Sequence, residues 1–272
     1  YLTTVLWPSH SQPVQTVSGS SGGGDMVQVY LLDEDATLIP YTLGIEEEQI
    51  LASDLYLYCR EKGRRMGVEG EFIGSPRLDD LQCAYGTLMG FLASEKGKED
   101  RAAAGEYGAV YALFDNEEIG SGTKQGADST FLSDIIDCIC DACGRNGMQK
   151  RDILSESFLL SADNAHGVHP NHPEKSDPTN RPYLNGGIVL KFQGSQKYTT
   201  DAYSAAVIRD ICREQDIPCQ NFANRADVPG GSTLGNISSA HVSIPAADIG
   251  LAQLAMHSAF ETAGEKDTEY LV

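Results

Sequence analysis

Residues 107–121, YGAVYALFDNEEIGS, join a short apolar run to an acidic cluster and a glycine turn. The run 107–114 is typical of a buried strand. Glu117 and Glu118 follow it, and two like charges buried side by side need a cation to compensate them. A metal ion would do so, with one glutamate as a ligand and the other holding the attacking water. A solvated acidic loop is the alternative, because the chain has 39 acidic residues.

Around this stretch, strands alternate with helices. The patterns predict strands at 26–32, 157–162, 187–192 and 240–244, and helices at 81–92, 130–143, 200–215 and 251–263. Such alternation implies an α/β sandwich with a largely parallel sheet. In such folds sites gather at the carboxyl ends of the strands, where the polar clusters of this chain fall.

Composition limits the function classes. The chain has 272 residues, 41% of them hydrophobic, and a formal net charge of −19, which disfavours binding to nucleic acid or to a membrane surface. No apolar run approaches the roughly 20 residues of a membrane-spanning helix, and no secretory signal is recognisable. Seven cysteines at irregular spacing favour reduced thiols and a cytoplasmic setting. Cys138, Cys140 and Cys143 could form a zinc cluster, but the apolar stripe of 130–143 favours positions on or beside a buried helix face.

Three further motifs offer ligands. Asp79 stands in PRLDDL, where paired aspartates could cap a helix or bridge two metals. Asp163 ends a predicted strand and precedes three histidines at three-residue spacing, in SADNAHGVHPNH. His257 lies on a mostly apolar predicted helix, where a satisfied core histidine is the common alternative. Together these carboxylates and the imidazole suit zinc, manganese or cobalt in a two-metal hydrolase.

Six motifs in order carry a family resemblance over roughly residues 46–264. They are SPRLDDL, DNEEIGS, SADNAHGVHPNHP, NGGIVLKFQGSQKYTTDA, DVPGGSTLGN and LAQLAMHS. The chain resembles the aspartyl aminopeptidase family of co-catalytic zinc metallopeptidases. The resemblance implies a three-layer α/β sandwich of the zinc-exopeptidase type with a mixed, largely parallel central sheet. It also implies removal of N-terminal Asp or Glu from peptides.

The resemblance implies a role for each matching metal-site residue. Asp79 would bridge two divalent metal ions, Glu118 and His257 would complete one site, and Asp163 would be a ligand of the other. Glu117 would be the general base of hydrolysis by metal-activated water.

Substrate contacts are implied by the same motifs. Lys191 interrupts the apolar run GIVLKF and would meet the acidic side chain of the substrate, although a surface lysine is the simpler interpretation of the residue alone. Tyr198 and His169 are further substrate contacts, and the turn at Gly231 would bring backbone N–H groups close to it, unless it is an ordinary tight turn.

The sequence departs from the family pattern at its N-terminal side. Residues 1–45, with the linker SGSSGGG at 18–24, read as an atypical segment or a remnant of the inserted assembly domain. Residues 46–272 read as the catalytic domain without its N-terminal His-ligand segment, which would leave an exposed sheet edge. The family also implies a homo-oligomer. Two alternatives remain: a related aminopeptidase of different specificity, and an inactive homologue or fragment that serves in binding or assembly.

Overall fold

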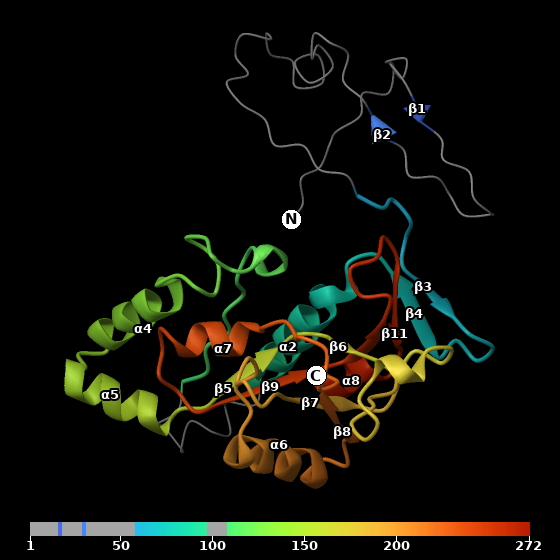
Figure 1. Cartoon of the computed structure of the whole chain (residues 1–272). Helices are drawn as coiled ribbons and strands as arrows, with labels where there is room; N and C mark the ends of the chain where they lie inside the picture. The colour runs from blue at the N-terminus through green and yellow to red at the C-terminus, as the bar shows by residue number, and fades with distance from the viewer. Residues whose placement is uncertain (1–15, 18–28, 31–57, 97–107) are drawn as a thin grey trace, which may run out of the picture. The chain divides into compact units, whose positions relative to one another are not determined.

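The computed structural model describes residues 16–17, 29–30, 58–96 and 108–272 (Figure 1). The chain divides into two compact units, Tyr1–Lys62 and Gly63–Val272. In the first unit β1 (Thr16–Val17) pairs antiparallel with β2 (Val29–Tyr30). β2 lies inside the strand predicted at 26–32, whose other residues are outside the described part.

The second unit is built on a four-stranded sheet. Its strands lie in the order β5 (Leu159–Ala162), β9 (Ala246–Gly250), β7 (Ile188–Phe192) and β8 (Cys219–Ala223). β5 runs parallel to β9 and β7 runs parallel to β8, whereas β7 and β9 are antiparallel. The expected mixed, largely parallel sheet is therefore confirmed, as are the strands predicted at 157–162 and 187–192.

Helices cover both faces of this sheet. Alternate residues of a strand point to opposite faces. Ala247 and Ile249 of β9 join a core cluster with residues of α6 (Ala202–Glu214) and α2 (Leu78–Lys96), and α8 (Asp267–Leu271) packs against it. Asp248, between them, faces α7 (Leu234–Ser239), whose Gly235 lies so close that an added Cβ would be 2.5 Å from Oδ1 of Asp248. Figure 1 shows α6 and α7 on opposite sides of the strands, which gives the predicted three layers.

A second, five-stranded sheet was not predicted. Its order is β3 (Arg64–Met66), β4 (Phe72–Ser75), β11 (Glu261–Gly264), β10 (Ala252–Leu254) and β6 (Ala165–His166). Only the β6–β10 pairing is parallel among these strands. β10 follows β9 after one residue, Leu251, so the two sheets are joined at the point where the polar motifs converge.

The helix predicted at 200–215 shows how local sequence sets an element. Asp201 accepts a hydrogen bond from the Ser204 backbone N–H and Ser204 Oγ accepts one from the Asp201 N–H, which forms a capping box. The buried residues Ala205, Ile208 and Cys212 recur at helical spacing on the face toward the sheet. Two further helices, α4 (Phe131–Ala142) and α5 (Gly147–Glu156), precede β5.

The cysteine prediction for α4 is confirmed only in part. Cys140 is buried, whereas Cys138 and Cys143 are exposed. The apolar stripe is incompletely covered, since Phe131, Ile135 and Ile139 are exposed large hydrophobic residues.

Three predicted elements are wrong. Residues 108–114 form no strand, and Tyr107 lies outside the described part. A strand needs a neighbouring strand to accept its hydrogen bonds. Among the described residues the edge strand β5 pairs with β9 alone, so residues 108–114 do not extend this sheet. Val110 and Leu113 are exposed, and Tyr111 instead donates to the carbonyl of Ala84 in α2 at 2.8 Å.

The C-terminal third was assigned incorrectly at two places. Residues 240–244 form no strand, because the strand begins after Pro245 as β9. The helix predicted at 251–263 is the hairpin β10–β11. Ala255 and His257 have φ values of 59° and 65°, a left-handed conformation that no right-handed helix contains.

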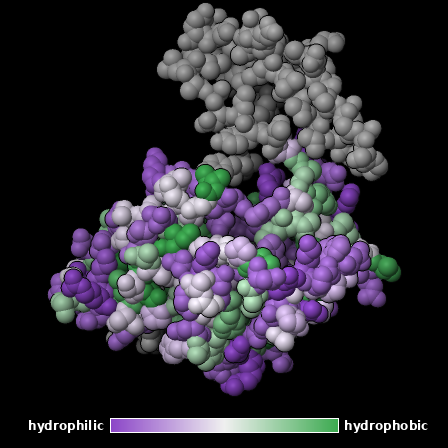
Figure 2. All heavy atoms as spheres, in the orientation of Figure 1, coloured by the Kyte–Doolittle hydropathy of each residue, from purple (hydrophilic) through white to green (hydrophobic). Residues whose placement is uncertain are grey.

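The surface of the described part is largely polar. The face in Figure 2 is mostly hydrophilic, with apolar residues in separate patches. α2 contributes an exposed apolar stripe of Leu81, Tyr85, Leu88 and Leu92. Among the described residues, no helix combines the length and apolar character needed to cross a membrane.

Candidate metal centre and active site

Three ligand-capable side chains from distant segments meet above the junction of the two sheets. His257 Nε2 lies 3.1 Å from Asp79 Oδ2 and 3.1 Å from Glu118 Oε2. One ligand atom from each residue lies within 4.8 Å of the other two. The family resemblance implied Asp79, Glu118 and His257 as ligands of one metal, and the structure brings these three side chains together.

Asp79 reaches the site from the start of α2. Its backbone is not helical (φ −82°, ψ 118°), so its N–H is free for a partner outside the helix and donates to Glu261 Oε2 at 2.9 Å. The Asp79 side chain is 6% exposed. A carboxylate so deeply placed needs a compensating charge.

Glu117 and Glu118 lie in a tight turn, η2 (Glu117–Ile119). Left-handed residues flank the turn, Asn116 with φ 62° and Gly120 with φ 98°, and asparagine and glycine tolerate that conformation best. The Asn116 amide donates to Thr123 Oγ1 at 2.8 Å, and the Ser121 N–H donates to the Asn116 carbonyl at 2.9 Å. These bonds hold the two carboxylates in one rigid loop.

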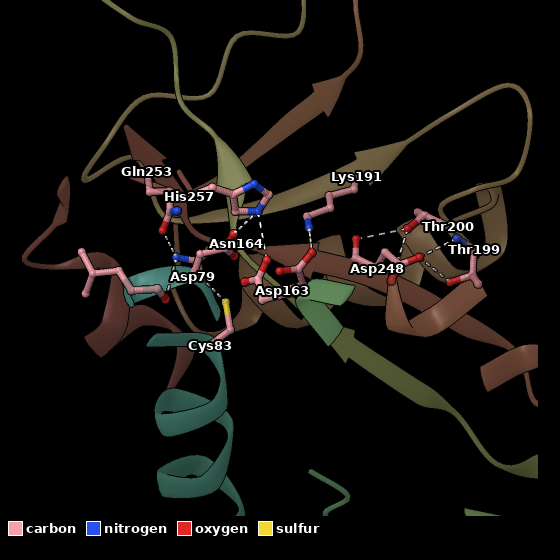
Figure 3. A network of polar contacts seen from close by, with 12 residues as sticks. Asp79, Cys83, Asp163, Asn164, Lys191, Thr199, Thr200, Asp248, Gln253 and His257 are labelled. Atoms are coloured by element: carbon pink, nitrogen blue, oxygen red, sulfur yellow. Dashed lines mark hydrogen bonds and ion pairs between the residues drawn. The ribbon is translucent and has the colours of Figure 1, made fainter. Parts of the chain in front are cut away.

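His257 comes from the loop between β10 and β11 rather than from the predicted helix. Its side chain is 67% exposed and points at the two carboxylates, and Figure 3 shows it facing Asp79. Its backbone N–H donates to Glu261 Oε1 at 2.7 Å. The motif indicated His257 as a ligand, although the helix predicted to carry it was wrong.

The acidic groups of the site hold protons more tightly than usual. Burial, with Asp163 and Glu118 nearby, raises the pKa of Asp79 to about 9. Burial, with the charges of Asp163 and Glu118, raises the pKa of both Asp80 and Glu117 to about 7. Burial also raises the pKa of Glu118, although His257 opposes it. In this cluster burial and mutual repulsion of the carboxylates outweigh the charges of Lys191 and His257.

Asp163 and Lys191 form a second feature beside the three ligands. Lys191 Nζ donates to Asp163 Oδ2 at 2.9 Å, and the Lys191 side chain is 2% exposed (Figure 3). Burial is the largest single effect and lowers the pKa of Lys191, but Asp163, Tyr198 and Asp248 together outweigh it, and the pKa ends above its ordinary value. Gly250 makes room for this pair, because an added Cβ would lie 2.1 Å from the Asp163 carbonyl oxygen.

Tyr198 lies under Lys191. The ammonium is 5.6 Å from the centre of its ring, and Tyr198 is buried in a core cluster with Phe222. Thr199, the next residue, donates through its N–H and its hydroxyl to Asp248 Oδ2, at 2.6 and 3.0 Å. The core cluster and the hydrogen bonds of the adjacent Thr199 therefore hold Tyr198 in place.

The structure does not bring every predicted substrate residue to the cluster. His169 lies in the exposed loop after β6, with its ring 5.3 Å from that of His172. Gly231 lies in the exposed segment before α7, with no atom within 4 Å of an added Cβ. Within the part of the chain that the structure describes, no hydrogen bond or ion pair joins His169 or Gly231 to Asp79, Glu118 or His257.

Sequence reasoning assigned no individual role to two residues around the site, Asn164 and His166, although His166 is one of the three histidines whose clustering indicated metal or substrate contact. His166 ends β6, and although its surface is partly exposed, its pKa is lowered by packing and by the charges of Lys191 and His257. Asn164 donates to Gln82 Oε1 at 3.1 Å, to the Leu78 carbonyl at 3.2 Å and to Gln253, while it accepts from Cys83 Sγ. His166 and Asn164 stand inside the histidine motif, so the spacing could have indicated them.

The donor set fits a zinc ion. Zinc takes carboxylate oxygen and imidazole nitrogen at roughly 2.0–2.2 Å in a tetrahedron, which places neighbouring donor atoms about 3.3 Å apart. The two separations of 3.1 Å from His257 Nε2 match that spacing. Burial and the neighbouring carboxylates raise the pKa of Asp79, and a bound cation would favour its ionised form.

Comparison with known proteins agrees with this chemistry. Residues 22–272 match the model of the aminopeptidase I zinc metalloprotease (M18) family. A "Probable M18 family aminopeptidase 2" of Clostridium acetobutylicum is 45% identical over 234 residues, which are 86% of this chain and 52% of the relative. The protein of the same description from Clostridium novyi (strain NT) is 44% identical over 228 residues, 84% of this chain and 51% of the relative. The chain thus spans about half the length of the curated relatives it matches.

Solved structures agree on the fold. A chain of the cryo-EM structure of the Ape4 and Nbr1 complex superposes with a TM-score of 0.78 and 36% identity, over 87% of this chain and 45% of that one. The S. cerevisiae mApe1 dodecamer gives a TM-score of 0.72 and 27% identity, over 87% and 52%. The match over residues 22–272 and the identity to the two clostridial relatives show that the chain belongs to the aminopeptidase I zinc metalloprotease (M18) family.

Proposed function

We propose that this chain releases N-terminal Asp or Glu from peptides as a zinc-dependent aminopeptidase. The observation that carries the proposal is the convergence of Asp79, Glu118 and His257, whose ligand atoms lie within 4.8 Å of one another. The three residues come from three separate segments, the start of α2, the turn η2 and the loop between β10 and β11, so their meeting is a property of the fold and not of neighbouring sequence.

Asp79, Glu118 and His257 would hold one metal ion, and Asp79 with Asp163 would hold a second. Zinc is the expected metal, and manganese and cobalt accept the same donors. When bound, the metal polarises the scissile carbonyl and lowers the pKa of the attacking water. In this proposal Asp163 remains a ligand of the second metal. Its negative charge contributes to the raised pKa of Asp79. Its Oδ2 accepts the hydrogen bond from Lys191.

Glu117 is the general base in this mechanism. It follows Asn116 in the same turn that carries Glu118, and in the metal-free chain burial and the neighbouring carboxylates raise its pKa to about 7. A carboxylate with that pKa accepts a proton from water and then returns it to the leaving amine with little thermodynamic cost.

Acidic specificity would come from Lys191, with Tyr198 below it. The hydrogen bond to Asp163 occupies one of the three ammonium donors of Lys191. A substrate carboxylate at a second donor would form a charge-assisted hydrogen bond inside a buried site, where such bonds are strongest. His169 and Gly231 remain proposed substrate contacts, on their motifs alone.

The setting and the partners follow from relatives and from sequence. The S. cerevisiae relative is described as a dodecamer, and we extend homo-oligomeric assembly to this chain as part of the proposal. A cytoplasmic setting rests on the odd number of cysteines.

The test is a panel of aspartyl, glutamyl and leucyl 4-nitroanilides, given to the zinc-loaded chain. We expect kcat/KM for the two acidic substrates to exceed that for the leucyl substrate about 10- to 100-fold, which is the value of one charge-assisted hydrogen bond. Equal or faster cleavage of the leucyl substrate would indicate an aminopeptidase of different specificity. No cleavage by a chain with zinc bound would refute peptidase activity for these 272 residues.

A further inference from the structure

Glu261 is a buried carboxylate that contacts Asp79 and His257, two of the three proposed metal ligands, without being a ligand itself. It is the first residue of β11, is 2% exposed and is among the largest fully buried side chains. Its Oε2 accepts the N–H of Asp79 at 2.9 Å and its Oε1 accepts the N–H of His257 at 2.7 Å. One carboxylate therefore spans two backbone segments that are far apart in the sequence.

The backbone of Glu261 is itself fixed. β11 is the middle strand of its sheet and pairs with β4, where Glu261 lies opposite Ser75, four residues before Asp79. On its other side β11 pairs with β10, which leads into the His257 loop. The carboxylate is thus held by the same strands from which the two ligand segments emerge.

Both ligand segments depend on an external acceptor at this point. Asp79 is not helical and His257 is left-handed, so neither N–H has a partner in regular secondary structure. A backbone N–H removed from water without an acceptor destabilises the fold. Glu261 supplies both acceptors at once.

We infer that Glu261 is a positioning residue that sets the separation of Asp79 and His257 by clamping both backbone amides with one carboxylate. The inference rests on the proposed metal site. Binding of two backbone N–H groups by one side chain requires an anion with two acceptor oxygens. A glutamine amide in the same place would offer one acceptor and turn an N–H donor toward the other N–H.

A zinc titration of the metal-free chain tests this role. Glu261→Gln should weaken zinc binding about 10- to 100-fold, the usual cost of removing a partner that orients a metal ligand. Glu261→Asp keeps the charge but is one methylene shorter, so we expect it to reach only one of the two amides and to weaken zinc binding as well. It is the second variant if the glutamine variant does not fold.

Asp267 provides a matched control. It is also a fully buried carboxylate, and it accepts two backbone N–H groups, from Asn185 at 2.7 Å and from Gly187 at 2.9 Å. Asp267→Asn should lower the melting temperature and leave zinc affinity unchanged. If both variants weakened zinc binding equally, Glu261 would have only a general role in stability and the inference would be wrong.

A crystal structure of metal-free Glu261→Gln separates this inference from the metal proposal. The separation of His257 Nε2 and Asp79 Oδ2 should increase beyond 3.1 Å. An unchanged separation overturns the positioning role. Failure of the unmodified chain to bind zinc, with the separation still increased in the variant, overturns the metal site and leaves the clamp in place.

Discussion

Glu117→Gln will lower the rate of peptide hydrolysis about 10²- to 10⁴-fold and leave zinc binding within a few-fold of the unmodified chain. Glutamine has the size of glutamate but accepts no proton near neutral pH, so only the proton transfer is lost. The pKa of about 7 at Glu117, raised by burial and by the neighbouring carboxylates, is the property that the substitution removes. Initial rates with the aspartyl anilide, measured beside zinc titrations, give both quantities.

The neighbouring residue supplies the control for that experiment. Glu118→Gln makes the same chemical change one residue later in the same turn, but it removes an oxygen that lies 3.1 Å from His257 Nε2. It should therefore weaken zinc binding as well as hydrolysis. If the two variants lost zinc to the same extent, Glu117 would be a ligand and not the general base. Undiminished hydrolysis by Glu117→Gln would remove it from the mechanism.

Lys191→Met will destabilise the metal-free protein by about 3–5 kcal/mol, the cost of leaving one partner of a buried ion pair without its counterion. Lys191 is 2% exposed and Asp163 is 14% exposed, so little water can replace the lost charge. Urea unfolding of the metal-free chain measures the change in the free energy of unfolding.

The double variant Asp163→Asn, Lys191→Met tests the cause of that loss. It removes both charges, and we expect it to recover a large part of the stability. Arg213→Met is the surface control, since the Arg213–Asp210 pair is exposed on α6 and should contribute little. A loss of less than about 1 kcal/mol for Lys191→Met would contradict the buried ion pair.

Sequence patterns predicted secondary structure best where several signals agreed. The run GIVLKF is buried on both faces and became β7, and the following helix has its cap at Asp201 and its apolar face at helical spacing. β9 was missed because its sequence AADIG holds only one of the β-branched residues that mark strands, Ile249, although all five of its residues are buried. Leu251 and the residues after it have helical spacing, but pairing of β10 with β6 and β11 overrides it.

The site was predicted by motif and not by periodicity. The sequence assigned His257 to a helix, but its motif indicated a ligand. The loop of the β10–β11 hairpin places this side chain beside Asp79 and Glu118. The role of Glu261 could not be predicted, because FETAG has no distinguishing pattern and the two amides that it binds belong to separate segments. The pairing of Lys191 with Asp163 likewise depends on the positions of β5 and β7 on either side of β9, which only the folded chain provides.

Anomalous X-ray diffraction at the zinc edge, from crystals of the zinc-loaded chain, tests the central claim most directly. The account predicts a peak about 2.0–2.2 Å from a carboxylate oxygen of Asp79, a carboxylate oxygen of Glu118 and His257 Nε2. A peak elsewhere, such as at Cys138 and Cys143, or no peak among these three side chains, would contradict it.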